Sequence, residues 1–146
     1  MKSPSATLVV DASVLISAVF GRSAGAIMRA QRNAVLVTTS RTVDEARRRI
    51  ELGLKRPELL DLLNELTGAL TVIPVTDIEV SLPRCEIALR DAVASRNGST
   101  RDAHLLALAW NVEGDIWSAD RDFAGTGVAT WSTPNLIRGL TEAAYE

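Results

Sequence analysis

The chain has 146 residues and a mass of 15.7 kDa, which is the size of one domain, so we expect residues 1–146 to form a single domain. Hydrophobic residues make up 47% and charged residues 23%, proportions that exclude a disordered chain. The net charge of −2 hides an asymmetry: residues 1–56 hold ten basic and four acidic side chains, whereas residues 57–146 hold six and fourteen. This asymmetry predicts one basic and one acidic region.

Several classes of protein are disfavoured by what the sequence lacks. Cys85 is the only cysteine and His104 the only histidine, so an internal disulfide, a usual zinc site and a Ser-His-Asp triad are all poorly supported. No apolar run approaches the roughly 18 residues of a membrane span, and Asp11 would interrupt the apolar segment of a signal peptide. We therefore expect a cytoplasmic protein, without contact with a membrane, whose chemistry depends on carboxylates.

Short apolar runs rich in β-branched residues predict buried strands, and apolar residues at helical spacing predict helices between them. In chain order we expect a strand at residues 7–10, helices at 13–20 and 23–32, a strand at 34–38, helices at 41–54 and 57–68, a strand at 70–75, a helix at 83–96, a helix after Thr100, strands at 115–118 and 128–131, and a helix from about Pro134.

Caps and apolar stripes support two of these helices. Ser13 is the predicted N-cap of the first helix, and Thr39 or Ser40 that of the helix over residues 41–54. The apolar stripe of the latter helix consists of Val43, Ala46, Ile50 and Leu54.

The alternation of strands and helices predicts an α/β fold, a three-layer sandwich in which helices flank a mostly parallel sheet. Such folds bind ligands at the carboxyl ends of the strands, where the strand order reverses. Acidic residues lie directly after several predicted strands or near the start of the helices that follow them. These acids are Asp11, Asp44, Glu45, Asp102, Asp120 and Asp122.

Each of these acids also has a structural explanation. An acidic side chain in the first turn of a helix complements the helix dipole, which accounts for Asp44, Glu45 and Asp102. Glu45 could also pair with Arg49 four residues later. Asp11 is the strongest functional candidate, because a carboxylate that continues a buried strand is costly without a partner.

If the acids do converge, their mutual repulsion favours a hard divalent cation. Mg²⁺ and Mn²⁺ prefer oxygen ligands, and a metal held by carboxylates can activate water and polarise a phosphoryl oxygen. Acids without histidine or cysteine ligands therefore favour phosphodiester hydrolysis.

Four segments that carry these acids resemble the PIN-domain nucleases, and more closely their VapC-like toxins. The closing motif is the most specific, with Ser118, Asp120, Asp122 and Phe123 at the spacing of the family. Nearly the whole chain takes part in the resemblance, and the four segments are residues 9–16, 42–46, 101–109 and 117–123.

This resemblance implies a Mg²⁺- or Mn²⁺-dependent ribonuclease that acts as the toxin of a type II toxin–antitoxin pair, forms a homodimer and is neutralised by a small antitoxin. It implies that the acidic catalytic and metal site is formed by Asp11, Glu45, Asp102 and Asp120. Asp122 would be a peripheral metal-binding acid, Ser118 would help to orient the four acids, and Ser13 would support the first of them, Asp11. Whether Asp44 or Glu45 is the second acid stays open.

A basic stretch accompanies the acids. Arg41, Arg48 and Arg49 could contact RNA phosphates, bind an acidic partner or form a solvated helix face. The apolar residues around Met28 and Leu63 could line a groove for a dimer or an antitoxin, although packing within the domain is the simpler account.

A non-catalytic protein of the same fold, which binds RNA or another protein, is the main alternative to a nuclease. A phosphoaspartyl phosphatase or receiver domain also places an Asp after its first strand. Both need a lysine near the late strands, but the lysines are Lys2 and Lys55. A P-loop nucleotidase is excluded because the chain has no glycine-rich loop that ends in GK[ST].

Four further side chains are assigned to packing. We expect Trp110, Trp117 and Trp131 to lie in the core rather than to stack on bases. His104 is expected to have a packing or surface role, because the implied chemistry does not require a histidine.

Overall fold

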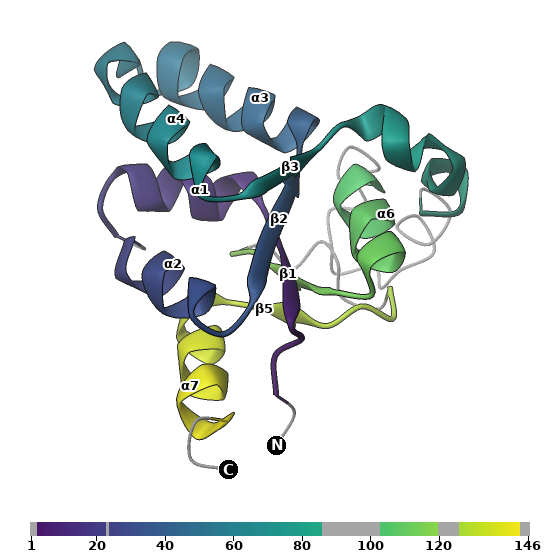
Figure 1. Cartoon of the computed structure of the whole chain (residues 1–146). Helices are drawn as coiled ribbons and strands as arrows, with labels where there is room; N and C mark the ends of the chain where they lie inside the picture. Colours follow the sequence, from purple (N-terminus) through teal and green to yellow (C-terminus); the bar gives the residue numbers. More distant parts are fainter. Residues whose placement is uncertain (1–2, 23, 86–102, 120–125, 144–146) are drawn as a thin grey trace.

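The computed structural model describes residues 3–22, 24–85, 103–119 and 126–143. Its centre is a five-stranded sheet in which every neighbouring pair is parallel. Figure 1 shows the labelled strands β1, β2, β3 and β5 at the centre with helices around them. The order in the sheet is β3-β2-β1-β4-β5, so the strand order reverses between β1 and β4. The strands are β1 (Thr7–Val10), β2 (Val35–Thr39), β3 (Thr71–Ile73), β4 (Asp115–Trp117) and β5 (Thr130–Trp131).

Helices connect β1 to β2 and β2 to β3, and a helix precedes β4. The predicted α/β sandwich with a parallel sheet is confirmed. The part of the predicted helix beyond residue 85 lies outside the described residues, although residues 82–85 are helical. The described helical elements are α1 (Ala12–Val19), α2 (Ala24–Gln31), α3 (Ser40–Arg48), the π-helical turn η1 (Arg49–Gly53), η2 (Pro57–Leu59), α4 (Leu60–Gly68), η3 (Val75–Ser81), α6 (Ala103–Val112) and α7 (Thr133–Ala143).

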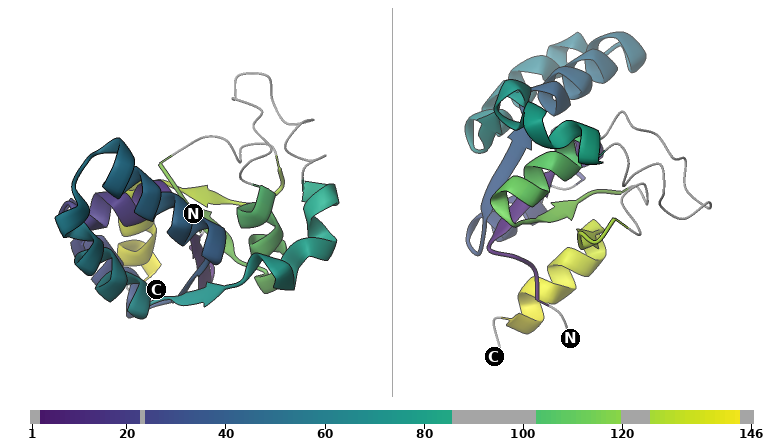
Figure 2. Two further views of the ribbon diagram at one scale, coloured as in Figure 1. Left: turned by 90° about the horizontal axis from the view of Figure 1, so that it is seen from above. Right: turned by 90° about the vertical axis from the view of Figure 1, so that its right-hand side faces the viewer.

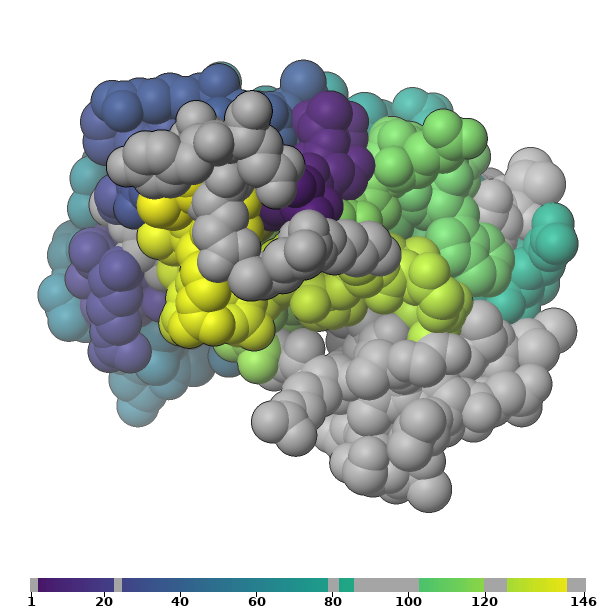
Figure 3. Space-filling view, turned by 90° about the horizontal axis from the view of Figure 1, so that it is seen from below, coloured from purple at the N-terminus to yellow at the C-terminus, as the bar shows by residue number. Residues whose placement is uncertain are grey.

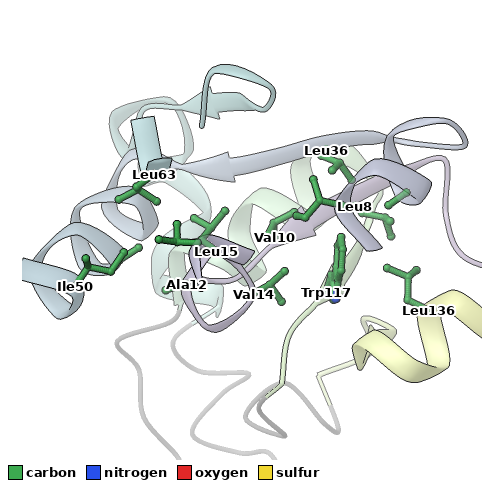
Figure 4. Close-up of a cluster of buried hydrophobic side chains, with 14 of the residues drawn as sticks. Leu8, Val10, Ala12, Val14, Leu15, Leu36, Ile50, Leu63, Trp117 and Leu136 are labelled. Carbon is green, nitrogen blue, oxygen red and sulfur yellow. The ribbon is translucent and has the colours of Figure 1, made fainter. Parts of the chain in front are cut away.

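The two faces of the sheet bury different sets of side chains, because successive residues of a strand point to opposite faces. Leu8 and Val10 of β1 join the larger cluster with residues of α1, α2, α4 and α7, which Figure 4 shows. Val9 joins the second cluster, which is formed mainly by α6. Figure 2 shows α1, α3 and α4 on one side of the sheet and α6 and η3 on the other.

The three tryptophans differ in burial. Trp117 on β4 is completely buried, and its indole Nε1 donates to Thr133 Oγ1 at 2.9 Å. Trp131 is half-buried and packs against the larger cluster, while α7 after it lies at the surface in yellow in Figure 3. The prediction for Trp110 is wrong: this side chain is 37% exposed, because it lies near the carboxyl end of α6 beyond the buried face of that helix.

Two predicted segments are cut short for identifiable reasons. The strand expected at residues 70–75 ends at Ile73, because Pro74 has no N–H to donate to the ladder. The helix expected at 41–54 changes to a π-helical turn at Arg49, with the Leu54 N–H bonded to the Arg49 carbonyl five residues earlier. This wider turn rotates Leu54 away from the buried stripe, so Leu54 is 49% exposed and its predicted burial is wrong.

None of the helices in the described part of the chain is long and apolar enough to cross a membrane.

The turn from α6 into β4 depends on Gly114. A Cβ atom at this position would lie 2.7 Å from the backbone carbonyl oxygen of Thr7, where β1 begins. We predict that Gly114→Ala lowers the free energy of unfolding by about 1–3 kcal/mol, because the backbone would have to shift. Urea unfolding tests this prediction.

The matched control is Gly68→Ala at the end of α4, where a Cβ atom meets nothing within 4 Å. This variant should be as stable as the wild type or up to about 1 kcal/mol more stable. Equal stability of the two variants would contradict the prediction for Gly114.

Candidate active site

Asp11 lies at the carboxyl end of β1, and its side chain is buried with 5% of its surface exposed. Its Oδ1 accepts a hydrogen bond from the Ala12 N–H at 2.7 Å. Its Oδ2 accepts hydrogen bonds from the Ser118 hydroxyl at 2.6 Å and, more weakly, from the Ser13 hydroxyl at 3.4 Å. The buried carboxylate therefore has the partners that its position in the sequence demands.

The N-cap of α1 is Asp11, so the prediction of Ser13 as the cap is wrong. Asp11 has the extended backbone of the strand, and the helix begins at the next residue, which leaves no turn between them. Ser13 instead directs its hydroxyl to Asp11, and it accepts a hydrogen bond from the Ala119 N–H at 3.3 Å.

This group of polar atoms lies where the strand order reverses. The Asp11 N–H bonds to the Trp117 carbonyl, which extends the pairing of β1 and β4 by one residue. Ser118 follows β4 directly, so its hydroxyl reaches the Asp11 carboxylate from the neighbouring strand. The reversal point of a parallel sheet is the usual place of a ligand site.

A second polar group lies at the carboxyl end of β2. Thr39 is the N-cap of α3, as predicted, and its hydroxyl accepts a hydrogen bond from the Thr42 N–H at 3.0 Å. Nδ1 of His104 on α6 lies 2.7 Å from the same hydroxyl oxygen, and all three side chains are buried. Burial lowers the pKa of His104 to about 4, and the nearby Arg41 guanidinium adds to this effect. His104 is therefore neutral at pH 7 and has the packing role that was expected.

Asp44 and Glu45 differ in their surroundings. The first turn of α3 contains no acidic residue, so the explanation of these two acids by the helix dipole fails. Glu45 is half-buried and lines a pocket of about 310 Å³ together with Arg48 and Arg49, whereas Asp44 is exposed. Glu45 and Arg49, both among the described residues, do not form the suggested ion pair, whereas Arg56 and Glu58 do form one.

Arg49 also lines a second pocket, of about 340 Å³, to which Ser13 contributes. Arg49 therefore lines both the pocket that contains Glu45 and the pocket that contains Ser13. Of the predicted basic residues, Arg48 and Arg49 line pockets, while Arg41 is exposed near His104. Sequence reasoning missed Arg22, which lines the second pocket and carries no motif that would have marked it.

The structure brings Asp11, Ser13 and Ser118 together. The predicted acids Asp102, Asp120 and Asp122 lie outside the described residues. Among the residues that the structure describes, no three His, Cys, Asp or Glu side chains are grouped closely enough to hold a metal ion.

Comparison with known proteins shows the family. The family model of the PIN domain matches residues 9–141 of this chain, so the chain belongs to the PIN-domain family. Among solved structures, PAE2754 from Pyrobaculum aerophilum has the same fold, with a TM-score of 0.62 and 17% sequence identity over 96% of this chain and 90% of that chain. No curated protein sequence gives a significant match. PIN domains are generally metal-dependent nucleases, which makes a nuclease the class of activity at the level of the family.

The hydrogen bond from Ser118 can be tested by Ser118→Ala. Removal of a donor from a buried carboxylate should lower the free energy of unfolding of the metal-free protein by about 1.5–3 kcal/mol. Urea unfolding in EDTA measures this loss. Ser3→Ala, at an exposed position, is the control and should unfold like the wild type. An unchanged midpoint for Ser118→Ala would mean that this bond does not hold Asp11.

The neutral state of His104 predicts a pH dependence. Because its pKa falls from 6.5 to about 4 on folding, its contribution to stability is complete above pH 6.5 and is lost as the pH falls toward 4. Between pH 6.5 and 4 the free energy of unfolding of the wild type should fall as the pH falls. This decline should be steeper than that of His104→Gln by up to about 1.4 kcal/mol per pH unit.

Urea unfolding of the metal-free proteins between pH 4 and 7.5 gives the two curves, and contributions from carboxylates common to both cancel. The single histidine also allows a direct check, since its imidazole NMR signals should titrate near pH 4. A midpoint near 6.5 would contradict the prediction.

Proposed function

We propose that the protein is a Mg²⁺- or Mn²⁺-dependent ribonuclease that hydrolyses RNA phosphodiester bonds, and that Asp11, Glu45, Asp102 and Asp120 are the acids of its metal site. The observation that carries this proposal is the buried Asp11 carboxylate, held by two hydroxyls and a backbone N–H at the reversal point of a parallel sheet. The membership of the chain in the PIN-domain family supports it independently.

The described donors fit a hard divalent cation. Asp11 presents carboxylate oxygens at the end of β1, and Glu45 lines a pocket that shares Arg49 with the pocket beside Ser13. His104 is the only imidazole of the chain, and it is buried against Thr39. Oxygen ligands without imidazole or thiolate favour Mg²⁺ or Mn²⁺ over zinc or copper.

Asp11, Glu45, Asp102 and Asp120 would hold the divalent ion, which would supply Lewis-acid chemistry toward a phosphoryl oxygen and toward water. Ser118 and Ser13 orient the Asp11 carboxylate by their hydrogen bonds. Asp122 acts as a peripheral acid. We favour Glu45 over Asp44 as the second acid, because Glu45 lines a pocket while Asp44 faces solvent.

We further propose that the protein is the toxin of a type II toxin–antitoxin pair, that it forms a homodimer in the cytoplasm, and that a small antitoxin protein neutralises it. This part follows the VapC-like resemblance of the sequence. An exposed apolar groove of about 320 Å³ between α1, α2 and α4 supports a protein partner, and Met28 and Leu62 at this groove are 60% and 47% exposed. Packing within the domain accounts for Ile27 and Leu63, which are buried.

The proposed metal site predicts that Glu45 and the adjacent Asp44 differ in their effect on metal binding and RNA cleavage. In the wild type, Mn²⁺ at about 100 times its dissociation constant should stabilise the fold by roughly 2.7 kcal/mol, a shift of a few degrees in the unfolding temperature. Glu45→Gln should reduce this shift and abolish RNA cleavage, since it removes a charged ligand. Thermal unfolding with and without Mn²⁺, together with an RNA cleavage assay, measures both effects.

Asp44→Asn is the matched control, because it removes one negative charge from the neighbouring position and should keep both the metal shift and cleavage. The reverse pattern would make Asp44 the second acid. A wild type that shows neither a metal shift nor cleavage would overturn the proposal and favour a non-catalytic PIN domain that binds RNA or protein.

A further inference from the structure

A pocket of about 340 Å³ lies between α1 and the π-helical turn η1, and we call it the α1–η1 pocket. Its apolar lining consists of Ile16, Phe20 and Leu54, and Ser17 adds a hydroxyl. Its first residue along α1 is Ser13, whose hydroxyl bonds to the Asp11 carboxylate. The α1–η1 pocket is therefore adjacent to the candidate metal site.

The α1–η1 pocket is positively charged. Arg22 and Arg49 belong to its lining, and no acidic residue does. Neither arginine forms an ion pair with another described residue, and both are exposed. Their guanidinium groups are thus available to an anion from outside the chain.

The π-helical turn builds one wall of this pocket. If α3 continued with ordinary geometry, Leu54 would extend the buried stripe of that helix. The bond from the Leu54 N–H to the Arg49 carbonyl instead brings both residues to the pocket. Beyond the turn, the Arg56 guanidinium lies 5.7 Å from the centre of the Phe20 ring, which ties this segment to α1. Turns of this kind occur frequently at functional sites.

We propose that the α1–η1 pocket binds one nucleotide of the RNA, next to the phosphodiester that is cut. Arg22 and Arg49 bind its backbone phosphate, and the base packs against Phe20 and Leu54. Guanidinium groups match phosphate geometry, and aromatic and apolar side chains accept the face of any base. The volume lies at the lower end of the roughly 300–1,000 Å³ of ligand pockets, which suits one nucleotide. The inference rests on the proposed function, because it assigns RNA as the ligand.

The first experiment measures binding of a fluorescently labelled single-stranded RNA by anisotropy, in EDTA to prevent cleavage, over a range of salt concentrations. Arg22→Gln and Arg49→Gln should each weaken binding about 5- to 10-fold. Each should also reduce the slope of log K against log salt, and the double variant should reduce it by about 0.7, the value for the one phosphate that the two arginines share on a single strand. Arg32→Gln, at an exposed position outside the pocket, is the charge-matched control and should change neither quantity.

Two further variants separate the phosphate contact from the base contact. Arg49→Lys keeps the charge but loses the guanidinium fork, so it should weaken binding while the salt slope is retained. Leu54→Ala should weaken binding several-fold without any change in slope, since it removes only apolar contact. Leu54 is half exposed, so this variant should fold like the wild type, which urea unfolding verifies.

The outcome distinguishes this inference from the proposed function. If the arginine variants bind RNA like the wild type and like Arg32→Gln, the α1–η1 pocket is not a nucleotide site, even when the Mn²⁺ shift and cleavage are intact. An equal effect of Arg22→Gln, Arg49→Gln and Arg32→Gln would also overturn the inference, because positive charge would then favour RNA binding equally inside and outside the pocket. Equal affinity for DNA of the same sequence would overturn the assignment of RNA as the ligand.

Discussion

The burial of the Asp11 carboxylate is the constraint on which the rest of the site depends. A carboxylate that is 5% exposed at the end of a buried strand is stable only if donors surround it. The parallel pairing of β1 and β4 supplies one donor, Ser118, and the immediate start of α1 supplies the Ala12 N–H and the Ser13 hydroxyl. The same pairing makes this place the reversal point of the strand order, so the requirement of folding and the position for ligand binding coincide.

The architecture and the buried position of Asp11 could be predicted from the sequence, because both depend on local patterns. Continuous β-branched runs marked the buried strands, and the break of such a run at Asp11 marked the acid. The cap at Thr39 was also predictable, since a hydroxyl before a helical stripe has few other uses. The grouping of Asp11 with Ser13 and Ser118 was implied by the family resemblance alone, and in the structure both hydroxyls donate to the Asp11 carboxylate.

The features that the sequence did not predict depend on contacts between residues far apart in the chain, or on a change in helical geometry. No pattern marks the π-helical turn at Arg49, so Leu54 was assigned to a stripe that the turn interrupts. Arg22 follows a glycine outside every motif, and only the fold places it with Arg49 around one pocket. The hydrogen-bond partner of His104 is Thr39 on β2, 65 residues earlier in the chain. Residue spacing along the helix of His104 cannot predict such a distant contact.

The contact between His104 and Thr39 has a consequence for the timing of assembly. Thr39 caps the helix that carries Glu45, and His104 lies in the first turn of the helix that Asp102 precedes in the sequence. A short hydrogen bond between two buried side chains therefore joins the starts of two helices before any ligand arrives. The entropic cost of ordering these two helices is incurred during folding. A ligand held between them would therefore bind to helices that are already in position.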